Sequence, residues 1–311
     1  MVPPGELSLW KSDPWTVRTE GDRIIGRGTE DNQQGLVSSV LAALAFVTQG
    51  CRPARTLKLL FAADEENGSA WGIDWLLQNH PGLFRGDDMV LIPDGGDSRG
   101  EGIEIAEKNL MWLRFVTRGV QAHGSRPDLG INAYLAATDL AMRLYNELSR
   151  IFSDHDPLFE PDYSTFQPTK KEANVPNINT IPGEDVFYMD MRVLPRYSIQ
   201  SVLKEIDRIK SEIEAKHKVT IEYSFAQKNE SPATSAQAPL VQKLSGAIQA
   251  VYGIRSRPVG IGGGTVGSFL RAKGIDCAVW SRIDETAHQP NEYALLDNIL
   301  GDAKVFALMC L

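Results

Sequence analysis

The side chains best suited to chemistry are acidic residues and one histidine, spread over the length of the chain. Asp31 follows a glycine-containing turn, Asp64-Glu65-Glu66 and Asp94 each close an apolar segment, and His288 lies in the segment 286–292. Carboxylates with a neutral imidazole are ligands that Zn²⁺ prefers, and two ions sharing a carboxylate can hold a water between them. Each aspartate also has an ordinary alternative as a helix cap or turn residue, and the acidic run by itself is typical of a solvated turn.

A second set of candidate residues lies in the middle of the chain. His123 stands among Gly, Ser, Arg and Pro residues, a composition typical of a shaped loop, and precedes a helix amino end suited to an anion. The alternative for His123 is a solvated loop residue. Arg192 could hold a carboxylate in a two-pronged grip, or form a surface ion pair with Asp190 or Glu184. The remaining histidines are interpreted as structural: His80, His155 and His217.

The segment Gly262–Gly267 fits the pattern G-x-G-x-x-G of dinucleotide-binding loops, with Asp284 and Glu285 downstream. That pattern needs a strong strand before it and a βαβ unit around it. Residues 255–261 contain a proline and few apolar side chains, which argues against such a strand. A glycine loop whose backbone N–H groups face an anionic substrate explains the same residues.

Alternating helices and strands are predicted for the two ends of the chain, where they position the acidic residues. Helical spacing of apolar residues predicts a helix over 35–49, and the short apolar runs 56–63 and 89–93 are typical of strands buried in a parallel sheet, the second ending at Asp94. Such an α/β domain usually binds ligands beyond the carboxyl ends of its strands, where both acidic clusters fall. The other predicted elements are helices over 70–78 and 238–252, a strand over 277–280 and a closing helix from Tyr293.

The sequence pattern in the middle of the chain predicts a second, different structural domain. Its elements are a strand over 109–118, a helix over 132–151, a strand pair 178–182 and 184–192 around Pro182-Gly183, a helix over 199–216 and a strand over 219–225. This is the β-α-β-β-α-β order of a ferredoxin-like unit, which can bury its own core. We therefore predict a domain over 108–227, inserted into a first domain made of 1–107 and 228–311.

The amino-acid composition argues against some classes of binding partner and bears on the cellular location. The 311 residues carry 40 Asp and Glu against 32 Lys and Arg, a net charge of −8, which argues against nucleic acid or anionic lipid as a partner. No apolar run reaches the roughly 18 residues needed to cross a bilayer, so no membrane partner is expected. The three cysteines form no C-x-x-C pair, and the amino terminus has no secretory signal. A cytoplasmic protein is predicted.

Three stretches together resemble the zinc metallohydrolase family that includes acetylornithine deacetylase, succinyl-diaminopimelate desuccinylase, aminoacylase and carboxypeptidase G. Gly26–Asp31 resembles the family's G-R-G-x-x-D, Glu65-Glu66 its paired glutamates, and Ala287–Glu292 its final histidine motif. The resemblance runs from the first residues to the last helix. It implies an α/β fold with a zinc-peptidase-like, mostly parallel sheet flanked by helices, and an inserted ferredoxin-like lid and dimerisation domain.

The resemblance also implies roles for the acidic residues and the histidine near the chain end. Asp31 would bridge two zinc ions, Glu66 and His288 would complete one of the two sites, and Asp94 would bind the other ion. Co²⁺ or Mn²⁺ could replace Zn²⁺. Glu65 would take a proton from the attacking water and pass it to the leaving amine.

The lid domain would supply the remaining roles that the resemblance implies. His123 would reach into the site of a partner subunit and stabilise the tetrahedral oxyanion, so a homodimer through the lid is expected. Asn179, Arg192 and the Gly263-Gly264-Thr265 loop would hold the substrate carboxylate. The implied enzyme is an amidohydrolase acting on N-acyl amino acids or small peptides. The alternative is a catalytically silent relative that keeps the fold and dimer but binds rather than cleaves.

Two departures from the family pattern bear on the metal site. Asn32-Gln33-Gln34-Gly35 stands where the family commonly has Lys and Gly, and the family's first ligand, a histidine in H-x-D, would fall just before Met1. Without that histidine, Asp31 and Asp94 would offer two carboxylates alone, which make a poor zinc site. We therefore expect at most one tightly bound zinc, little or no amidase activity and an exposed sheet edge from these 311 residues, and two zinc ions in a full-length form.

Overall fold

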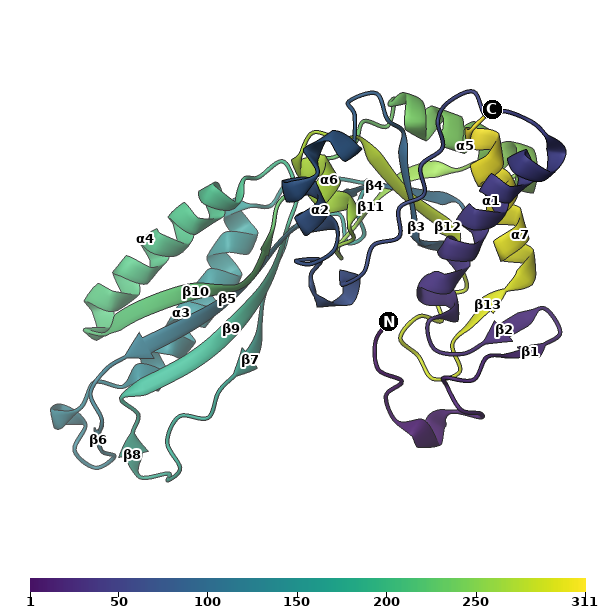
Figure 1. Cartoon of the computed structure of the whole chain (residues 1–311). Coiled ribbons are helices and arrows are strands. Elements are labelled where there is room, and N and C mark those ends of the chain that lie inside the picture. The colour runs from purple at the N-terminus through teal and green to yellow at the C-terminus, as the bar shows by residue number, and fades with distance from the viewer. The chain divides into compact units, whose positions relative to one another are not determined.

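The computed structural model describes all residues, 1–311. The chain forms two compact units (Figure 1). The first unit consists of Met1–Ala106, Ala233–Val259 and Thr265–Leu311, and the second of Glu107–Pro232 and Gly260–Gly264. The fold is therefore a mixed α/β fold in which the second unit interrupts the chain of the first.

A four-stranded sheet in the order β11-β4-β12-β3 forms the centre of the first unit. Its strands are β3 (Val90–Asp97), β4 (Gly102–Glu107), β11 (Arg257–Ile261) and β12 (Cys277–Arg282). Strand β12 pairs parallel with β3 and antiparallel with β4, so the sheet is mixed rather than mostly parallel as expected. Strand β12 is almost wholly buried because its run Cys-Ala-Val-Trp is apolar on both faces.

Five helices flank this sheet: α1 (Gly35–Gln49), α2 (Ile73–Asn79), α5 (Pro239–Tyr252), α6 (Gly267–Ala272) and α7 (Leu296–Met309). Helices α1 and α5 each pack against α7. Both α1 and α5 end at a glycine in the left-handed conformation, Gly50 and Gly253, where a residue without Cβ meets no steric penalty. No helix of the structure combines the length and apolar character needed to span a bilayer. The cytoplasmic location stays a prediction.

A small antiparallel sheet, which the sequence analysis missed, lies at the other end of the first unit. It consists of β1 (Arg18–Glu20), β2 (Arg23–Ile25) and β13 (Tyr293–Leu295), in the order β1-β2-β13. Strands β1 and β2 form a hairpin whose two-residue turn contains Gly21 at φ +60°, a conformation that favours glycine. Pairing of β2 with β13 brings the segment after β2 close to the segment before β13.

Three expected elements of the first unit differ in the structure. Residues 56–63 are not a strand: the run is mostly exposed and pairs with no neighbour, and an apolar pattern alone cannot supply the hydrogen-bonding partner that a strand requires. Strand β3 does not end at Asp94 but continues to Asp97. The closing helix begins at Leu296 rather than Tyr293, because Tyr293–Leu295 pairs with β2.

The second unit contains a four-stranded antiparallel sheet with the order β10-β5-β9-β7. The chain order is β5 (Asn109–Arg118), α3 (Ala133–Ile151), β7 (Thr165–Lys171), β9 (Glu184–Val193), α4 (Ile199–His217) and β10 (Thr220–Asn229). Both long helices start at a side-chain cap, Asn132 for α3 and Ser198 for α4. Their apolar faces form one core with the sheet, in which Phe115 stacks on Phe187 and Leu144 is fully buried.

Strand pairing in the second unit differs from the expected hairpin 178–182/184–192. The pair that forms is β6 (Ala122–His123) with β8 (Thr180–Ile181), whereas β9 pairs with β5 and β7. Strand β7 escaped prediction because its sequence is mostly polar, with Pro168 at an edge position that needs no donor. The short helical turns of both units are η1 (Leu7–Leu9), η2 (Thr29–Gln34), η3 (Glu65–Asn67), η4 (Pro81–Leu83) and η5 (Pro127–Leu129).

Candidate metal centre

Three side chains of metal-ligating type converge in the first unit: Asp31, Glu66 and His288. One ligand atom from each lies within 4.8 Å of the other two. His288 Nε2 is 2.9 Å from Asp31 Oδ2 and 3.3 Å from Glu66 Oε1. Asp31 comes from η2, Glu66 from η3, and His288 from the loop before β13. The structure thus brings together three of the four residues expected to bind metal, from segments far apart in the sequence.

The surroundings of Glu66 fit a bound cation. Its Oε1 is buried and accepts no hydrogen bond, although His288 Nε2 is nearby. A buried carboxylate oxygen without a donor is costly, and a divalent ion would satisfy it. Asp31 and Glu66 are partly buried while the His288 side chain is 54% exposed, so the group is open to solvent on the imidazole side. Two carboxylates and one imidazole suit a catalytic zinc ion, which has three protein ligands and keeps one position open.

Glu65 lies beside this group but does not belong to it. Burial raises the pKa of Glu65, and the negative charges of Glu66 and Asp31 raise it further. A carboxyl group with a raised pKa is better able to take up and release a proton near neutral pH. The position of Glu65 therefore suits proton transfer, whereas the position of Glu66 suits ligation.

Asp94 is half-buried within β3 and is not one of the three grouped side chains. Burial raises its pKa to about 7, with further contributions from the charges of Asp31 and Glu65. Its Oδ1 accepts a hydrogen bond of 2.7 Å from Asn32 Nδ2, which also donates to Pro93 O at 2.7 Å. Asn32, which the sequence analysis noted only as a departure from the family pattern, thus connects the Asp31 segment to β3. A role for Asp94 in holding a second ion remains a prediction.

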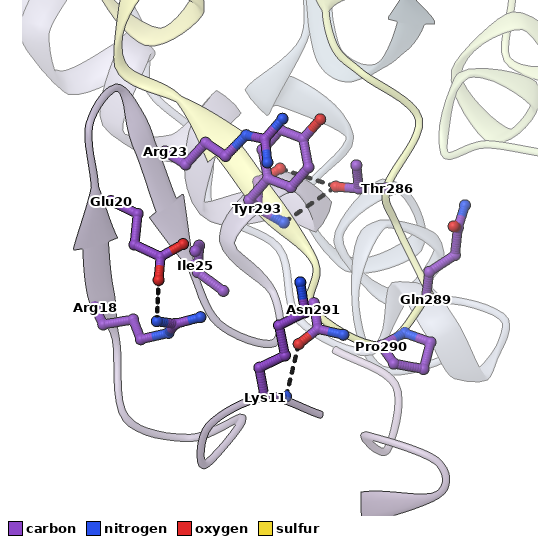
Figure 2. A pocket seen from close by; sticks show the side chains of 10 residues that line it. All are labelled: Lys11, Arg18, Glu20, Arg23, Ile25, Thr286, Gln289, Pro290, Asn291 and Tyr293. Atoms are coloured by element: carbon purple, nitrogen blue, oxygen red, sulfur yellow. Dashed lines mark hydrogen bonds and ion pairs between the residues drawn. The ribbon is translucent and has the colours of Figure 1, made fainter. Parts of the chain in front are cut away.

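A pocket of about 230 Å³ lies between the loop that carries His288 and the β1–β2 hairpin (Figure 2). Hydrogen bonds next to this pocket also hold the loop in place. Thr286 Oγ1 accepts a hydrogen bond from Tyr293 N at 3.1 Å and lies 2.8 Å from Tyr293 O. The side chain of Asn291 accepts from Lys11 N at 2.8 Å and donates to Leu9 O at 2.9 Å. These contacts join the two ends of the loop to each other and tie the loop to the segment 9–11.

The expected lid residues His123 and Asn179 lie together in the second unit. His123 is in β6, which pairs with β8, and Figure 1 shows these two short strands side by side at one end of the unit. Asn179 O accepts a 2.6 Å hydrogen bond from Gly124 N. The His123 ring is exposed, and its Nδ1 is 2.8 Å from Ser125 Oγ. The structure brings these two side chains to one end of the unit; their roles stay predictions.

Arg192 forms the ion pair that the sequence analysis left as the alternative to substrate binding. Its Nε and Nη2 donate to the two carboxylate oxygens of Asp190 at 2.6 and 2.9 Å, and Nη1 donates to Gly262 O at 2.7 Å. The two-pronged face of the guanidinium is therefore already engaged. The neighbouring Gly263 and Gly264 continue the loop of the second unit from Gly262.

The glycine-rich segment lies between the strand β11 and the helix α6, although its sequence argued against a strong strand before it. However, β11 is an edge strand, where Pro258 is tolerated, and α6 has only six residues. Thr265 begins the first-unit part of this segment, and its Oγ1 accepts a 3.0 Å hydrogen bond from Gly267 N. The βαβ unit that a dinucleotide fold needs around such a loop does not form, because the sheet neighbour of β11 is β4.

The whole chain, residues 1–311, matches peptidase family M20/M25/M40. The protein belongs to the M20 family. It is 41% identical to an uncharacterised metallohydrolase of Methanococcus maripaludis, over 98% of this chain and 77% of that protein. It is 26% identical to succinyl-diaminopimelate desuccinylase of Coxiella burnetii, over 94% of this chain and 76% of that protein. The resemblance inferred from the motifs is thereby confirmed, and the protein is an M20 metallohydrolase.

Solved structures agree with the M20 assignment at the level of the fold. The aminopeptidase PepT of Bacillus cereus superposes with a TM-score of 0.79 at 16% identity, covering 95% of this chain and 75% of that chain. An M20 metallo-carboxypeptidase of Sulfolobus solfataricus superposes with a TM-score of 0.72 at 19% identity, covering 99% of this chain and 82% of that chain. The α/β fold of the chain is therefore that of known M20 peptidases.

Two buried residues with clear structural roles were missed as individual residues by the sequence analysis: Glu30 and Glu292. Each stands inside a quoted motif, next to Asp31 and four residues after His288 respectively. Their exposed fractions are 5% and 1%. Acidic residues are rarely this buried unless they are paired. The available signal was their place beside the ligands, but the sequence alone does not separate a buried glutamate from a solvated one.

Proposed function

We propose that this protein is a metal-dependent amidohydrolase that cleaves the amide bond of N-acyl amino acids or small peptides carrying a free carboxylate. The observation that carries the proposal is the group of Asp31, Glu66 and His288, whose ligand atoms lie within 4.8 Å of one another with Glu65 beside them. The named relatives, a desuccinylase and M20 peptidases, act on amide bonds and support the substrate class.

The proposed metal is Zn²⁺, held by Asp31, Glu66 and His288, with Co²⁺ or Mn²⁺ as substitutes. When bound, such an ion polarises the amide carbonyl and lowers the pKa of water. Glu65 takes a proton from the attacking water and gives it to the amine nitrogen as the C–N bond breaks. The same carboxyl group thus acts first as base and then as acid.

The second unit, with its β-α-β-β-α-β order, is proposed as a ferredoxin-like lid through which two copies of the chain form a homodimer. His123 would donate a hydrogen bond to the oxyanion in the site of the partner subunit. Asn179 and the Gly263-Gly264-Thr265 loop would bind the substrate carboxylate. Arg192 would take part only if its ion pair with Asp190 were shared with the substrate.

The test combines metal analysis with a panel of N-acetyl amino acids, N-succinyl amino acids and dipeptides, before and after chelation. Turnover of any panel substrate should be lost with the metal, restored by Zn²⁺ and abolished in Glu65→Gln. Asp64→Asn, which changes the adjacent carboxylate outside the ligand group, is the matched control and should keep its activity. Metal binding without turnover of any substrate would favour the silent relative. Absence of both metal binding and turnover would overturn the proposal.

A further inference from the structure

We propose that Glu30 and Glu292 are positioning residues that fix the spacing of Asp31 and His288 by a reciprocal exchange. Each glutamate belongs to one ligand-bearing segment and binds the backbone N–H groups of the other segment. The inference rests on the proposed function, because the two side chains being positioned are its proposed metal ligands. Neither glutamate is itself proposed as a ligand.

Glu292 holds the segment that carries Asp31. Its Oε1 accepts hydrogen bonds from Glu30 N and Asp31 N, both at 3.0 Å, and its Oε2 accepts one from Gly28 N at 3.0 Å. Oε2 also pairs with the guanidinium of Arg27, and both side chains of this ion pair are 1% exposed. The backbone N–H of Asp31 itself is therefore fixed by a residue that lies four positions beyond His288.

Glu30 holds the segment that carries His288. Its Oε1 accepts a hydrogen bond from Asp284 N at 2.7 Å, and its Oε2 accepts from Thr286 N and from Ala287 N, the latter at 2.9 Å. The hydroxyl of Thr286 lies 3.0 Å from the same oxygen. The segment immediately before His288 is therefore tied to the residue immediately before Asp31.

The His288 segment needs such support because its own backbone is strained. Glu285, His288 and Asn291 have φ angles of 59°, 62° and 61°, in the left-handed region that residues other than glycine rarely adopt. This conformation is unfavourable for such residues and persists only where the surroundings impose it. The segment has no helix or strand of its own before Tyr293. The carboxylate of Glu30 therefore accepts hydrogen bonds from backbone N–H groups that regular secondary structure would otherwise satisfy.

The carboxylates of Glu30 and Glu292 are suited to positioning the metal ligands rather than to binding a metal themselves, because their oxygens are already hydrogen-bonded. Both oxygens of each glutamate already accept donors, whereas Oε1 of Glu66 is buried and accepts none. Groups that orient metal ligands typically change metal affinity by about 10–100-fold when they are removed. Loss of either glutamate should therefore weaken metal binding while leaving all three proposed ligands in the chain.

The test measures Zn²⁺ affinity of the metal-free protein by competition with a chromophoric chelator, together with the absorption spectrum of the Co²⁺ form. We expect about 10–100-fold weaker Zn²⁺ binding and an altered Co²⁺ spectrum in both Glu30→Gln and Glu292→Gln. The matched control is Asp97→Asn, because Asp97 also holds a turn by accepting three backbone N–H groups, from Arg99, Glu101 and Gly102. It should lower thermal stability without changing the metal affinity or the spectrum.

The double variant separates positioning from general destabilisation. If the two glutamates hold one geometry, the double variant should bind Zn²⁺ little more weakly than the worse single variant, whereas independent effects would multiply. If a glutamine variant does not fold, Glu30→Asp and Glu292→Asp keep the charge but shorten the reach, and should bind Zn²⁺ more weakly than the wild type. The Zn²⁺ affinity and Co²⁺ spectrum of these aspartate variants are compared with those of Asp97→Asn in the same way.

The outcomes distinguish this inference from the proposed function. If the wild type binds no metal, the proposed function fails and the inference fails with it. If the wild type binds Zn²⁺ and the glutamate variants bind it equally well, the inference alone is overturned. Equal weakening in Asp97→Asn would also overturn it, because the effect would then follow from lost stability rather than from ligand geometry.

Discussion

Asp302 of α7 should make the stability of the first unit depend on pH in a direction opposite to that of an ordinary aspartate. The residue is fully buried and accepts hydrogen bonds from the Tyr252 hydroxyl at 2.9 Å, Gln34 Nε2 at 3.2 Å and Arg282 N at 3.2 Å. Gln34 closes the turn that carries Asp31, and Arg282 precedes the loop that carries His288. Asp302 is therefore hydrogen-bonded to residues that adjoin both ligand-bearing segments.

Burial raises the pKa of Asp302 from 3.8 to about 7. The folded state thus binds a proton that the unfolded state has already released, and the stability from this group is fully present below pH 3.8 and is lost as the pH rises towards 7. One pKa unit corresponds to about 1.4 kcal/mol, so the loss between pH 5 and pH 7 is about 2 kcal/mol. Asparagine has no proton to lose, and Asp302→Asn should remove this pH dependence.

The assay is urea unfolding of the chelator-treated wild type and Asp302→Asn at pH 5, 6 and 7. The free energy of unfolding of the variant, relative to the wild type, should rise by about 2 kcal/mol from pH 5 to pH 7. Asp297→Asn changes an exposed aspartate of the same helix and should show no such trend. Parallel pH profiles for the wild type and Asp302→Asn would refute the reasoning, whatever the constant difference between them.

Three further predictions concern the proposed site and the core of the second unit. Glu65→Gln should retain zinc by metal analysis and lower kcat by about 10²–10⁴, whereas Glu66→Gln should lose zinc; equal zinc loss in both would reject the division of roles. His123→Ala should keep its zinc content and lower kcat by about 10²–10³ in steady-state assays, and an undiminished rate would return His123 to a solvated loop residue. Leu144→Ala should lower the free energy of unfolding by about 2–5 kcal/mol without changing the metal affinity of the folded protein, since Leu144 is fully buried in the second unit; a loss below 1 kcal/mol would contradict this packing.

The helices could be predicted from the sequence because their signals are local. Helix α1 has the predicted bounds, and α3 and α4 differ from prediction by one residue at one end each. The spacing of apolar residues lies within each helix, and α3 and α4 also begin at a side-chain cap, so no distant partner is needed to recognise them. Strand β5 also has its predicted bounds, because alternation is clear in a strand with one face in the core.

The strand partners could not be predicted because pairing joins distant segments. Residues 56–63 have the pattern of a buried strand but pair with nothing in the structure, whereas the polar β7 forms a full edge strand beside β9. The small sheet that joins β2 to β13 has only three residues in each strand. Such short strands carry no usable periodicity, although they bring the two ligand-bearing segments together.

The residue types of the candidate site could be predicted, but not the contacts that fix their geometry. Asp31, Glu66 and His288 stood out by type and motif, and the structure places them side by side. The reciprocal bonds of Glu30 and Glu292 were invisible because they join side chains to backbone groups more than 250 residues away. The pairing of Arg192 with Asp190 was foreseen only as one of two alternatives.

The most direct test of the central claim is a titration of Zn²⁺ into the metal-free protein, compared with His288→Ala. We predict one tightly bound ion per chain in the wild type and its loss in the variant, because His288 supplies the only nitrogen of the three-residue group. His80→Ala changes a histidine outside this group and should bind Zn²⁺ as the wild type does. Tight binding that survives His288→Ala, or a wild type that binds no Zn²⁺, would contradict the account.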